Sequence, residues 1–192
     1  SLVGSEMCIR DRTDGVPLDE LVSLDKFILH KAHQTQQTIV KAYADMDFHS
    51  VVQAVSVFCS QDLGGFYLDI IKDRTYTTKA NGKPRRSAQT ALYHIAQALV
   101  RWIAPILPFT AQEAWGFIRS DMDEKYIFST LWYELPTPAL TAITSDDWVM
   151  ILAVKDTVNK AMDEARTSKL ISSNLTAKAT ITTDGDTLTA LN

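Results

Sequence analysis

The sequence contains few cysteines, only Cys8 and Cys59 in 192 residues. They show no C-x-x-C spacing, so the chain can build neither a disulfide framework nor a cysteine-rich structural zinc site. This scarcity is typical of a reducing compartment, and we expect a cytoplasmic protein. A long apolar run is also missing, since the richest stretch, "ALVRWIAPILPFTA", is interrupted by Arg101 and two prolines. We therefore expect no membrane-spanning helix and no membrane partner.

An excess of positive charge is missing as well. The formal net charge is −4, which excludes a protein that coats nucleic acid over its whole surface. Hydrophobic residues make up 46% and charged residues 22% of the chain, a balance typical of folded globular proteins. A local basic patch is compatible with this composition, so binding through one restricted surface stays open.

The motifs of common catalytic and metal centres are absent. The sequence has no HExxH, no glycine-rich phosphate loop and no GxSxG elbow. His30 and His33 are three residues apart and could share a helix face, but the chain has no Glu-x-x-His pair, which di-iron bundles require. We interpret both as surface or interface histidines, and we expect no catalytic residue and no metal ligand in this chain.

What the chain does contain is apolar residues at three- and four-residue steps, which predict amphipathic helices. The first helix is expected over residues 18–44, with Pro17 and Asp19 in its first turn. The second is expected over residues 47–71, capped by Asp47.

Gly64 and Gly65 interrupt the second helix. We expect them either to let a neighbouring helix approach closely or to mark a kink. The following stretch "TTKANGKP" predicts a loop, because it contains the turn signal Asn-Gly and a proline that disfavours a helical Lys83.

Three further helices complete the pattern. One is expected over residues 85–103. The next is expected to begin at a Thr110 cap, with Glu113 in a capping box, and the last is expected to begin at an Asp146 cap. After them "LTAKATITT" alternates polar and apolar residues as a strand does. The elements predict a mainly α fold: an antiparallel four- to five-helix bundle, followed by the start of a small α/β module.

The same pattern predicts the domain organisation. We expect residues 13–144 to form the bundle and residues 145–192 to begin the α/β module, which would make the chain a fragment of a longer protein. Residues 1–12, "SLVGSEMCIRDR", show neither a helical nor a strand period and resemble a translated sequencing adapter. We expect them to be a non-native or disordered leader.

The most informative feature is a basic segment from Lys72 to Arg86, which holds six of the nineteen Lys and Arg residues and a single acid, Asp73. It is either a solvated loop or a surface that meets something negative. Cations at a helix C-terminus are ordinary, but Arg85 and Arg86 open a helix, where the helix dipole disfavours them. With Tyr76 nearby for stacking, this arrangement resembles a nucleic-acid contact, and from these residues alone the solvated loop stays open as the alternative.

The residues around this segment carry a resemblance. "DFHSVVQAVSVFCSQDLGGFYLDIIKDRTYT" and "RRSAQTALYHIAQALVRWIAPILPFTAQEAW" closely resemble the anticodon-binding helical bundle of the isoleucyl-tRNA synthetase family, class I enzymes. The resemblance covers about residues 13–183 and is most specific in "FYLDIIKDR" and "ALVRWIAPILPFT". The segment "VKDTVNKAMDEAR" resembles the beginning of the family's C-terminal junction module.

The resemblance implies that this chain binds the anticodon stem-loop of an isoleucine tRNA. It also implies a parent enzyme that joins isoleucine to its tRNA with ATP and Mg²⁺, through catalytic and editing domains that this chain does not contain. The family's HIGH and KMSKS motifs are absent here, and the cysteine-rich zinc module of bacterial-type members would lie beyond Asn192. We expect a monomer and no DNA partner.

The resemblance and the basic segment together predict one tRNA-facing group. Its members are Lys72, Arg74, Tyr76, Lys79, Lys83, Arg85, Arg86 and Arg101. The lysines and most arginines would neutralise phosphates, Tyr76 would stack on a loop base, and one arginine would reach a base edge. Arg74 could instead form an ion pair with Asp69 or Asp73, and Arg101 could instead be paired inside the protein. Both alternatives to RNA contact stay open.

The large aromatic residues are assigned mainly to packing. We expect Phe66, Trp102, Phe109 and Trp115 in the core, and Trp132 and Tyr133 to seal the bundle. Two alternatives to the functional assignment remain at this stage. One is the anticodon-binding domain of a valyl-tRNA synthetase, and the other is a free-standing helical module that binds RNA or protein.

Overall fold

The computed structural model describes residues 15–79, 81–119, 123–140, 143–173 and 177–182. The expected leader, residues 1–12, lies outside these ranges. The chain divides into two compact units, Ser1–Ala139 and Leu140–Asn192, which are described separately below. No helix in the described ranges is long and apolar enough to cross a bilayer.

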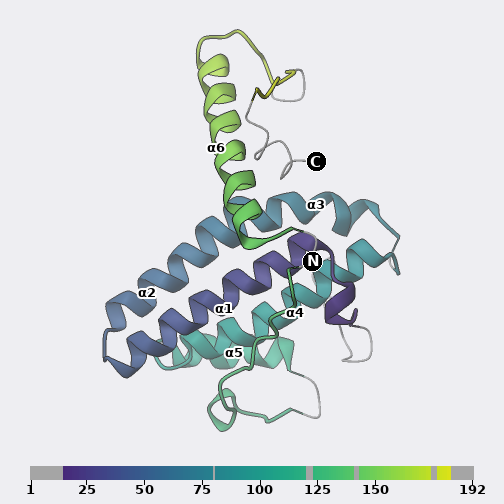
Figure 1. The fold of residues 1–192 in the computed structure, drawn as a ribbon. Helices are drawn as coiled ribbons and strands as arrows, with labels where there is room; N and C mark the ends of the chain where they lie inside the picture. The colour runs from purple at the N-terminus through teal and green to yellow at the C-terminus, as the bar shows by residue number, and fades with distance from the viewer. Residues whose placement is uncertain (1–14, 80, 120–122, 141–142, 174–176, 183–192) are drawn as a thin grey trace. The chain divides into compact units, whose positions relative to one another are not determined.

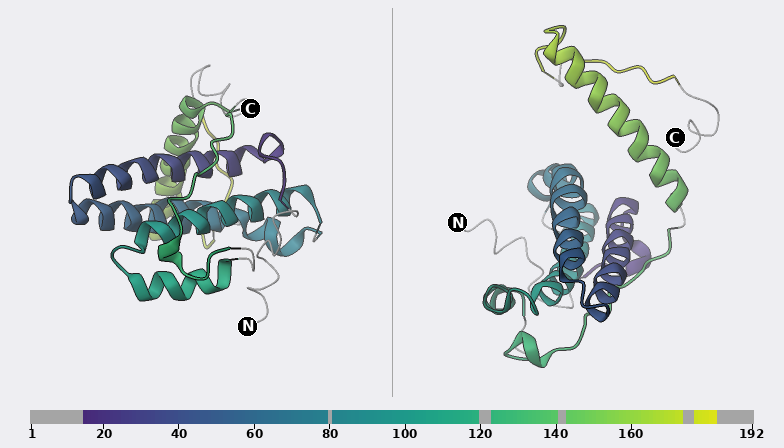
Figure 2. Two further views of the ribbon diagram at one scale, coloured as in Figure 1. Left: turned by 90° about the horizontal axis from the view of Figure 1, so that it is seen from below. Right: turned by 90° about the vertical axis from the view of Figure 1, so that its left-hand side faces the viewer.

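The first unit is built from helices that lie side by side (Figure 1). In chain order its elements are η2 (Leu18–Glu20), α1 (Ser23–Ala44), α2 (Phe48–Val57), η3 (Phe58–Tyr67), α3 (Leu68–Thr77), α4 (Lys83–Ile103), α5 (Pro108–Ile118) and η4 (Ile127–Ser129). Helix α1 packs on α2 and on α4, α3 packs on α4, and α5 packs on α4. The right-hand view in Figure 2 shows α1 and α2 nearly end-on and side by side. The predicted helical bundle is confirmed.

Helices α2 and α3 are joined by η3, a π-helical segment, into one continuous helical stretch. A Cβ atom on Gly64 would lie 3.1 Å from the carbonyl oxygen of Cys59, and one on Gly65 would lie 3.2 Å from that of Ser60. Both carbonyls belong to the same widened helix. The expectation that a neighbouring helix approaches these glycines is therefore wrong, and the alternative of a local distortion fits the π segment.

Several expected helix starts are wrong by a few residues. Helix α1 begins at Ser23, because residues 18–20 form a separate 3-10 turn. Helix α4 begins at Lys83, since Pro84 is tolerated in a first turn. Helix α5 begins at Pro108 without a side-chain cap, so Thr110 is not its cap. The Asp47 cap is confirmed, with its carboxylate accepting the backbone N–H of Ser50 at 3.1 Å.

The interior between these helices is aromatic. The rings of Phe58 and Trp102 meet edge to face at 5.5 Å between centroids, and the Trp102 indole donates to the side chain of Gln36 at 2.8 Å. Trp115 forms a second cluster with Ala111 and other apolar residues of α4, α5 and η4. Of the four aromatic residues assigned to the core, Phe66, Trp102 and Trp115 are buried. Phe109 is exposed, so its assignment is wrong.

The second unit contains one long helix, α6 (Ser145–Thr167). It begins with a capping box in which Thr144 and Asp147 exchange hydrogen bonds, so the expected Asp146 cap is wrong. The expected strand is also not formed in its described part, residues 177–182. A strand needs a partner for its backbone hydrogen bonds, and none of the described residues supplies one.

Candidate nucleic-acid interface

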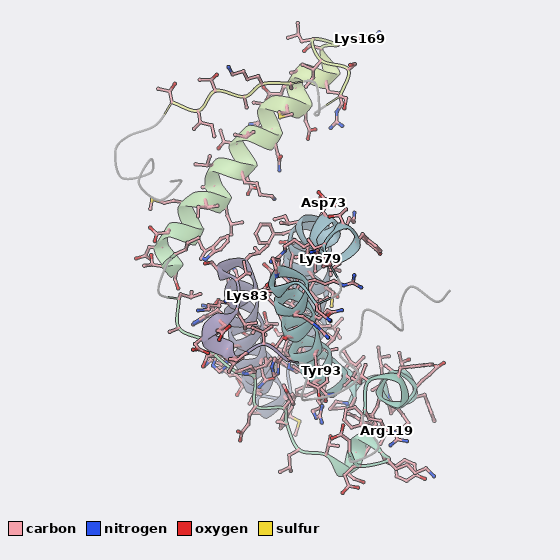
Figure 3. All side chains as sticks on the ribbon, turned by 90° about the vertical axis from the view of Figure 1, so that its right-hand side faces the viewer. Asp73, Lys79, Lys83, Tyr93, Arg119 and Lys169 are labelled. Carbon is pink, nitrogen blue, oxygen red and sulfur yellow. The ribbon has the colours of Figure 1, made fainter. Side chains whose placement is uncertain are left out.

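The basic segment lies at the end of the first unit where α3 gives way to α4. Figure 3 shows Asp73, Lys79 and Lys83 at this end. The connection closes with a hydrogen bond from Gly82 N–H to the Lys79 carbonyl at 2.8 Å. A Cβ on Gly82 would lie 3.0 Å from that same carbonyl, so glycine fits the turn best. The turn places the last residues of α3 beside the first residues of α4.

Three lysines of this segment are exposed. Lys72 pairs with Asp69 at 2.7 Å and Lys83 pairs with Glu20 at 3.4 Å. Both pairs are open to solvent, where such pairs contribute little to stability. The hydrogen bond from Lys72 to Asp69 and the charge of Asp69 raise the pKa of Lys72, so the ammonium stays charged. Lys79 is exposed as well. These lysines can exchange their partners for phosphate oxygens.

Tyr76 is the exposed aromatic residue of the segment. Its relative exposure is 63%, and it lies on α3 between Lys72 and Lys79 in the chain. A tyrosine ring in solvent beside cations is the kind of side chain on which an unpaired nucleic-acid base stacks. The expected position of Tyr76 on the surface is thus found.

Arg85 and Arg86 in the first turns of α4 are half-buried. A guanidinium nitrogen of Arg86 donates to the side chain of Asn81 at 3.2 Å, which ties α4 to the turn before it. The Nε atom of Arg85 and the Oε1 atom of Gln89 are buried and have no hydrogen-bond partner among the described residues. Both arginines are thus partly open to solvent, and they follow Lys83 directly in the chain after Pro84.

Arg74 faces the interior instead. Its guanidinium forms a two-point contact with Asp25, with Nη2 at 2.7 Å from Oδ1 and Nη1 at 3.3 Å from Oδ2. The expected alternative, an ion pair of Arg74 with Asp69 or Asp73, named the wrong acid. Arg74 pairs with Asp25, and Asp69 pairs with Lys72.

Asp25 is the centre of a buried polar cluster that joins α1 to η3, α3 and α4. The Tyr67 hydroxyl donates to Oδ1 at 2.8 Å, and the Ser87 hydroxyl donates to Oδ2. Burial and the Asp25 carboxylate raise the pKa of Tyr67 far above its ordinary value, so this hydroxyl stays protonated. Ser87 in turn accepts the backbone N–H of Val22 at 2.9 Å.

Arg101 lies near the opposite end of α4, roughly 27 Å along the helix axis from Lys83. Its guanidinium stacks over the Trp115 ring at 4.7 Å and lies 5.4 Å from the Tyr133 ring. It also donates to the carbonyl of Leu131 at 2.9 Å and to that of Gln97 at 2.7 Å. These contacts engage the half-buried Arg101 within the protein, and the structure does not bring it together with the basic segment.

The polar residues of α4 likewise serve internal contacts. Thr90 accepts the backbone N–H of Val16 at 3.0 Å, and the Nδ1 atom of His94 lies 2.7 Å from the Tyr133 hydroxyl. Burial lowers the pKa of His94. These contacts attach the segments before α1 and after α5 to the bundle.

Asp25 itself was missed in the sequence. The available signal is its place in α1, where a carboxylate shares the buried side of the helix with Ile28 and Leu29. A buried acid requires a cation and donors, and the search for them leads to Arg74.

Within the described ranges, no three His, Cys, Asp or Glu side chains gather in a way that could hold a metal ion.

Comparison with known proteins gives a family match and several similar proteins. Residues 25–181 match the model of a family described as "Anticodon-binding domain of tRNA ligase". The chain is also similar to proteins named isoleucine–tRNA ligase. That of Psychrobacter arcticus is 55% identical over 173 residues, 90% of this chain and 18% of the relative.

Two further relatives carry the same name. The protein from Acinetobacter baylyi is 51% identical over 181 residues, 94% of this chain and 19% of the relative. The one from Xanthomonas axonopodis pv. citri is 45% identical over 174 residues, 90% of this chain and 18% of the relative. The chain thus spans less than a fifth of the length of each relative.

Proposed function

Because the chain belongs to the anticodon-binding domain family of tRNA ligases, we propose that it binds the anticodon stem-loop of an isoleucine tRNA through the basic segment, Lys72 to Arg86. The observation that carries this assignment is the α3–α4 junction. It gathers exposed lysines, two half-buried arginines and the exposed Tyr76 on an otherwise acidic chain. Cations position an RNA backbone, and an exposed aromatic ring holds an unstacked base.

The eight residues of the predicted group divide by geometry. The RNA-facing set that we propose consists of Lys72, Tyr76, Lys79, Lys83, Arg85 and Arg86. Arg74 and Arg101 act within the protein, since their guanidinium groups are engaged with Asp25 and with Trp115 and Tyr133. The RNA surface is accordingly smaller than the sequence pattern indicates.

The activity of the whole protein is a further part of the proposal. A ligase that contains this domain would attach isoleucine to its tRNA in the cytoplasm, as a monomer, with ATP and Mg²⁺ bound in other domains. Zinc would belong to a module outside this chain. Among the described residues, no three His, Cys, Asp or Glu side chains gather in a way that could hold a metal ion.

The test is binding of the 192-residue chain to an isoleucine anticodon stem-loop and to a stem-loop with a scrambled anticodon. We expect tighter binding to the first. The double variant Lys79→Gln/Lys83→Gln should weaken binding to both, because lysine contacts to phosphate carry no sequence information. The matched control is Lys41→Gln/Lys125→Gln, which removes the same charge from exposed positions elsewhere in the unit. Equal binding of the two loops, unchanged by either double variant, would refute the proposal.

A further inference from the structure

The outer face of α5 exposes two phenylalanines. Phe109 has a relative exposure of 90% and Phe117 one of 83%, although the opposite side of the same helix buries Ala111 and Trp115 in the bundle. Two large apolar rings on the solvent side of one short helix are unusual for a surface without a partner. We call the side formed by Phe109, Glu113, Gly116 and Phe117 the α5 outer face.

Gly116 is a second, independent feature of this face. A Cβ atom placed on it would have nothing within 4 Å, and its backbone is not in the left-handed region. Neither crowding nor conformation within the unit therefore calls for glycine, which is less favourable than alanine inside a helix. What a glycine provides here is close access to the helix backbone between two exposed rings.

The charge of the face distinguishes a protein partner from a nucleic acid. Helix α5 contains no Lys or Arg, and Glu113 is its charged residue. Within α5, an RNA backbone would meet a carboxylate and no cation, unlike at the basic segment. An apolar protein surface with a close-packing helix matches two phenylalanines beside a glycine.

We propose that the α5 outer face is an interdomain docking surface that packs against an apolar helix elsewhere in the ligase polypeptide. This inference rests on the proposed function, that the chain works as one part of an isoleucine–tRNA ligase. The relatives are long enough to contain such a partner helix, since more than four fifths of the length of the Psychrobacter arcticus protein lies outside the matched segment. The face lies on α5 and the basic segment at the α3–α4 junction, so the two use different elements.

The experiment compares the 192-residue chain with a chimera. In the chimera, residues 15–182 replace the matching segment of the Psychrobacter arcticus ligase. Hydroxyl-radical footprinting measures the oxidation rates of Phe109 and Phe117 in both proteins. We expect both rates to fall several-fold in the chimera. The variant Gly116→Leu should not lower the melting temperature of the 192-residue chain, and it should restore oxidation in the chimera. The matched control Gln53→Leu, at an exposed position of α2, should leave the protection intact.

Three results would overturn the inference. The first is equal oxidation of the two rings in the chain and the chimera. The second is protection in the chain alone when the stem-loop RNA is added, which would make RNA the occupant. The third is protection in the chain alone that grows with protein concentration together with a dimer mass, which would make a second copy the occupant.

The two proposals fail separately. A chimera that binds the isoleucine stem-loop but leaves Phe109 and Phe117 as reactive as before refutes the docking surface only. A chimera that protects both rings but discriminates no stem-loop refutes the proposed function and supports the docking surface.

Discussion

The carboxylate of Asp25 has no exposed surface, and the guanidinium of Arg74 meets it with two nitrogens, the nearer at 2.7 Å. The arginine side chain is itself only 19% exposed. This contact fastens α3 to α1. A cation that resembles an RNA contact in the sequence is therefore part of the interior of the protein.

The variant Arg74→Met should destabilise the fold and leave RNA recognition alone. Removing one member of a buried pair leaves an uncompensated charge, so we expect the free energy of unfolding to fall by roughly 3–5 kcal/mol. Urea denaturation measures this change. Because such a loss can unfold the chain, RNA binding is measured on Asp25→Asn/Arg74→Met, which removes both charges and should recover part of the stability. An RNA affinity whose salt dependence drops in this double variant would place Arg74 in the RNA interface instead.

The variant Arg85→Gln/Arg86→Gln should reduce the salt dependence of stem-loop binding. Each lost contact to a phosphate lowers the slope of log K against log salt concentration by about 0.7 to 0.9. Fluorescence anisotropy over a series of salt concentrations gives the slope. Since Arg86 also binds Asn81, the melting temperature is recorded in parallel. An unchanged slope in a folded variant would remove these two arginines from the RNA-facing set.

The variant Tyr76→Ala should weaken binding of the single-stranded loop without affecting the fold. Stacking of a base on an aromatic ring contributes about 1–3 kcal/mol, and the exposed ring makes little contribution to packing. The conservative change Tyr76→Phe keeps the ring and should bind as the original chain does. Equal losses in both variants would point to the hydroxyl, and no loss in either would exclude stacking at this position.

Stability should decrease as the pH falls through the range in which histidine titrates. Burial lowers the pKa of His94 below its ordinary value of 6.5, so the unfolded chain binds a proton more readily than the folded one. The contribution of neutral His94 is present above the unfolded pKa and is lost as the pH drops toward the folded pKa.

The matched variants are His94→Gln and His49→Gln, the latter at an exposed position of α2. We expect the first to show a smaller drop in melting temperature than the original chain between about pH 8 and about pH 5, and the second serves as the control for removing a histidine from an exposed position. Identical curves for all three proteins would contradict the assignment of this dependence to His94.

Alanine should have different effects at two glycines. At Gly116 a methyl group meets open space, and we expect Gly116→Ala to stabilise the chain by about 0.4–1 kcal/mol. At Gly64 the methyl group would crowd the Cys59 carbonyl, so Gly64→Ala should gain less or lose stability. Parallel urea titrations of both variants test the comparison, which fails if Gly64→Ala is the more stabilising of the two.

Much of the fold can be predicted from the sequence, because the apolar period of each helix is local information. The periods in α1 and α4 place both helices within a few residues of their observed bounds. The helix starts are less predictable, since Thr110 and Pro108 both suit a first turn and only tertiary packing decides between them. Gly64 and Gly65 indicate a local distortion, but the sequence does not distinguish a π segment from a kink.

The candidate site likewise has a part that can be predicted from the sequence and a part that cannot. The basic segment is visible in the sequence, because its lysines and Tyr76 lie close together in the chain. The partner of Arg74 is not, because Asp25 is 49 residues away and only the packing of α1 against α3 brings them together. From the sequence alone, Arg74 is therefore assigned wrongly to a nearby acid such as Asp73. Long-range ion pairs need the fold before they can be assigned.

The π segment η3 also acts as an angular spacer. An α-helix turns by about 100° per residue, and a π segment turns by less, because its hydrogen bonds span five residues rather than four. Deleting Gly64 or Gly65 while η3 keeps this bonding would rotate every later side chain around the helix axis by most of that angle. Arg74 would swing away from Asp25, and the side of α3 that now carries Lys72 and Tyr76 to solvent would turn elsewhere. The number of residues between Phe58 and Tyr67 thus determines the direction, around the helix axis, in which α3 presents its cations.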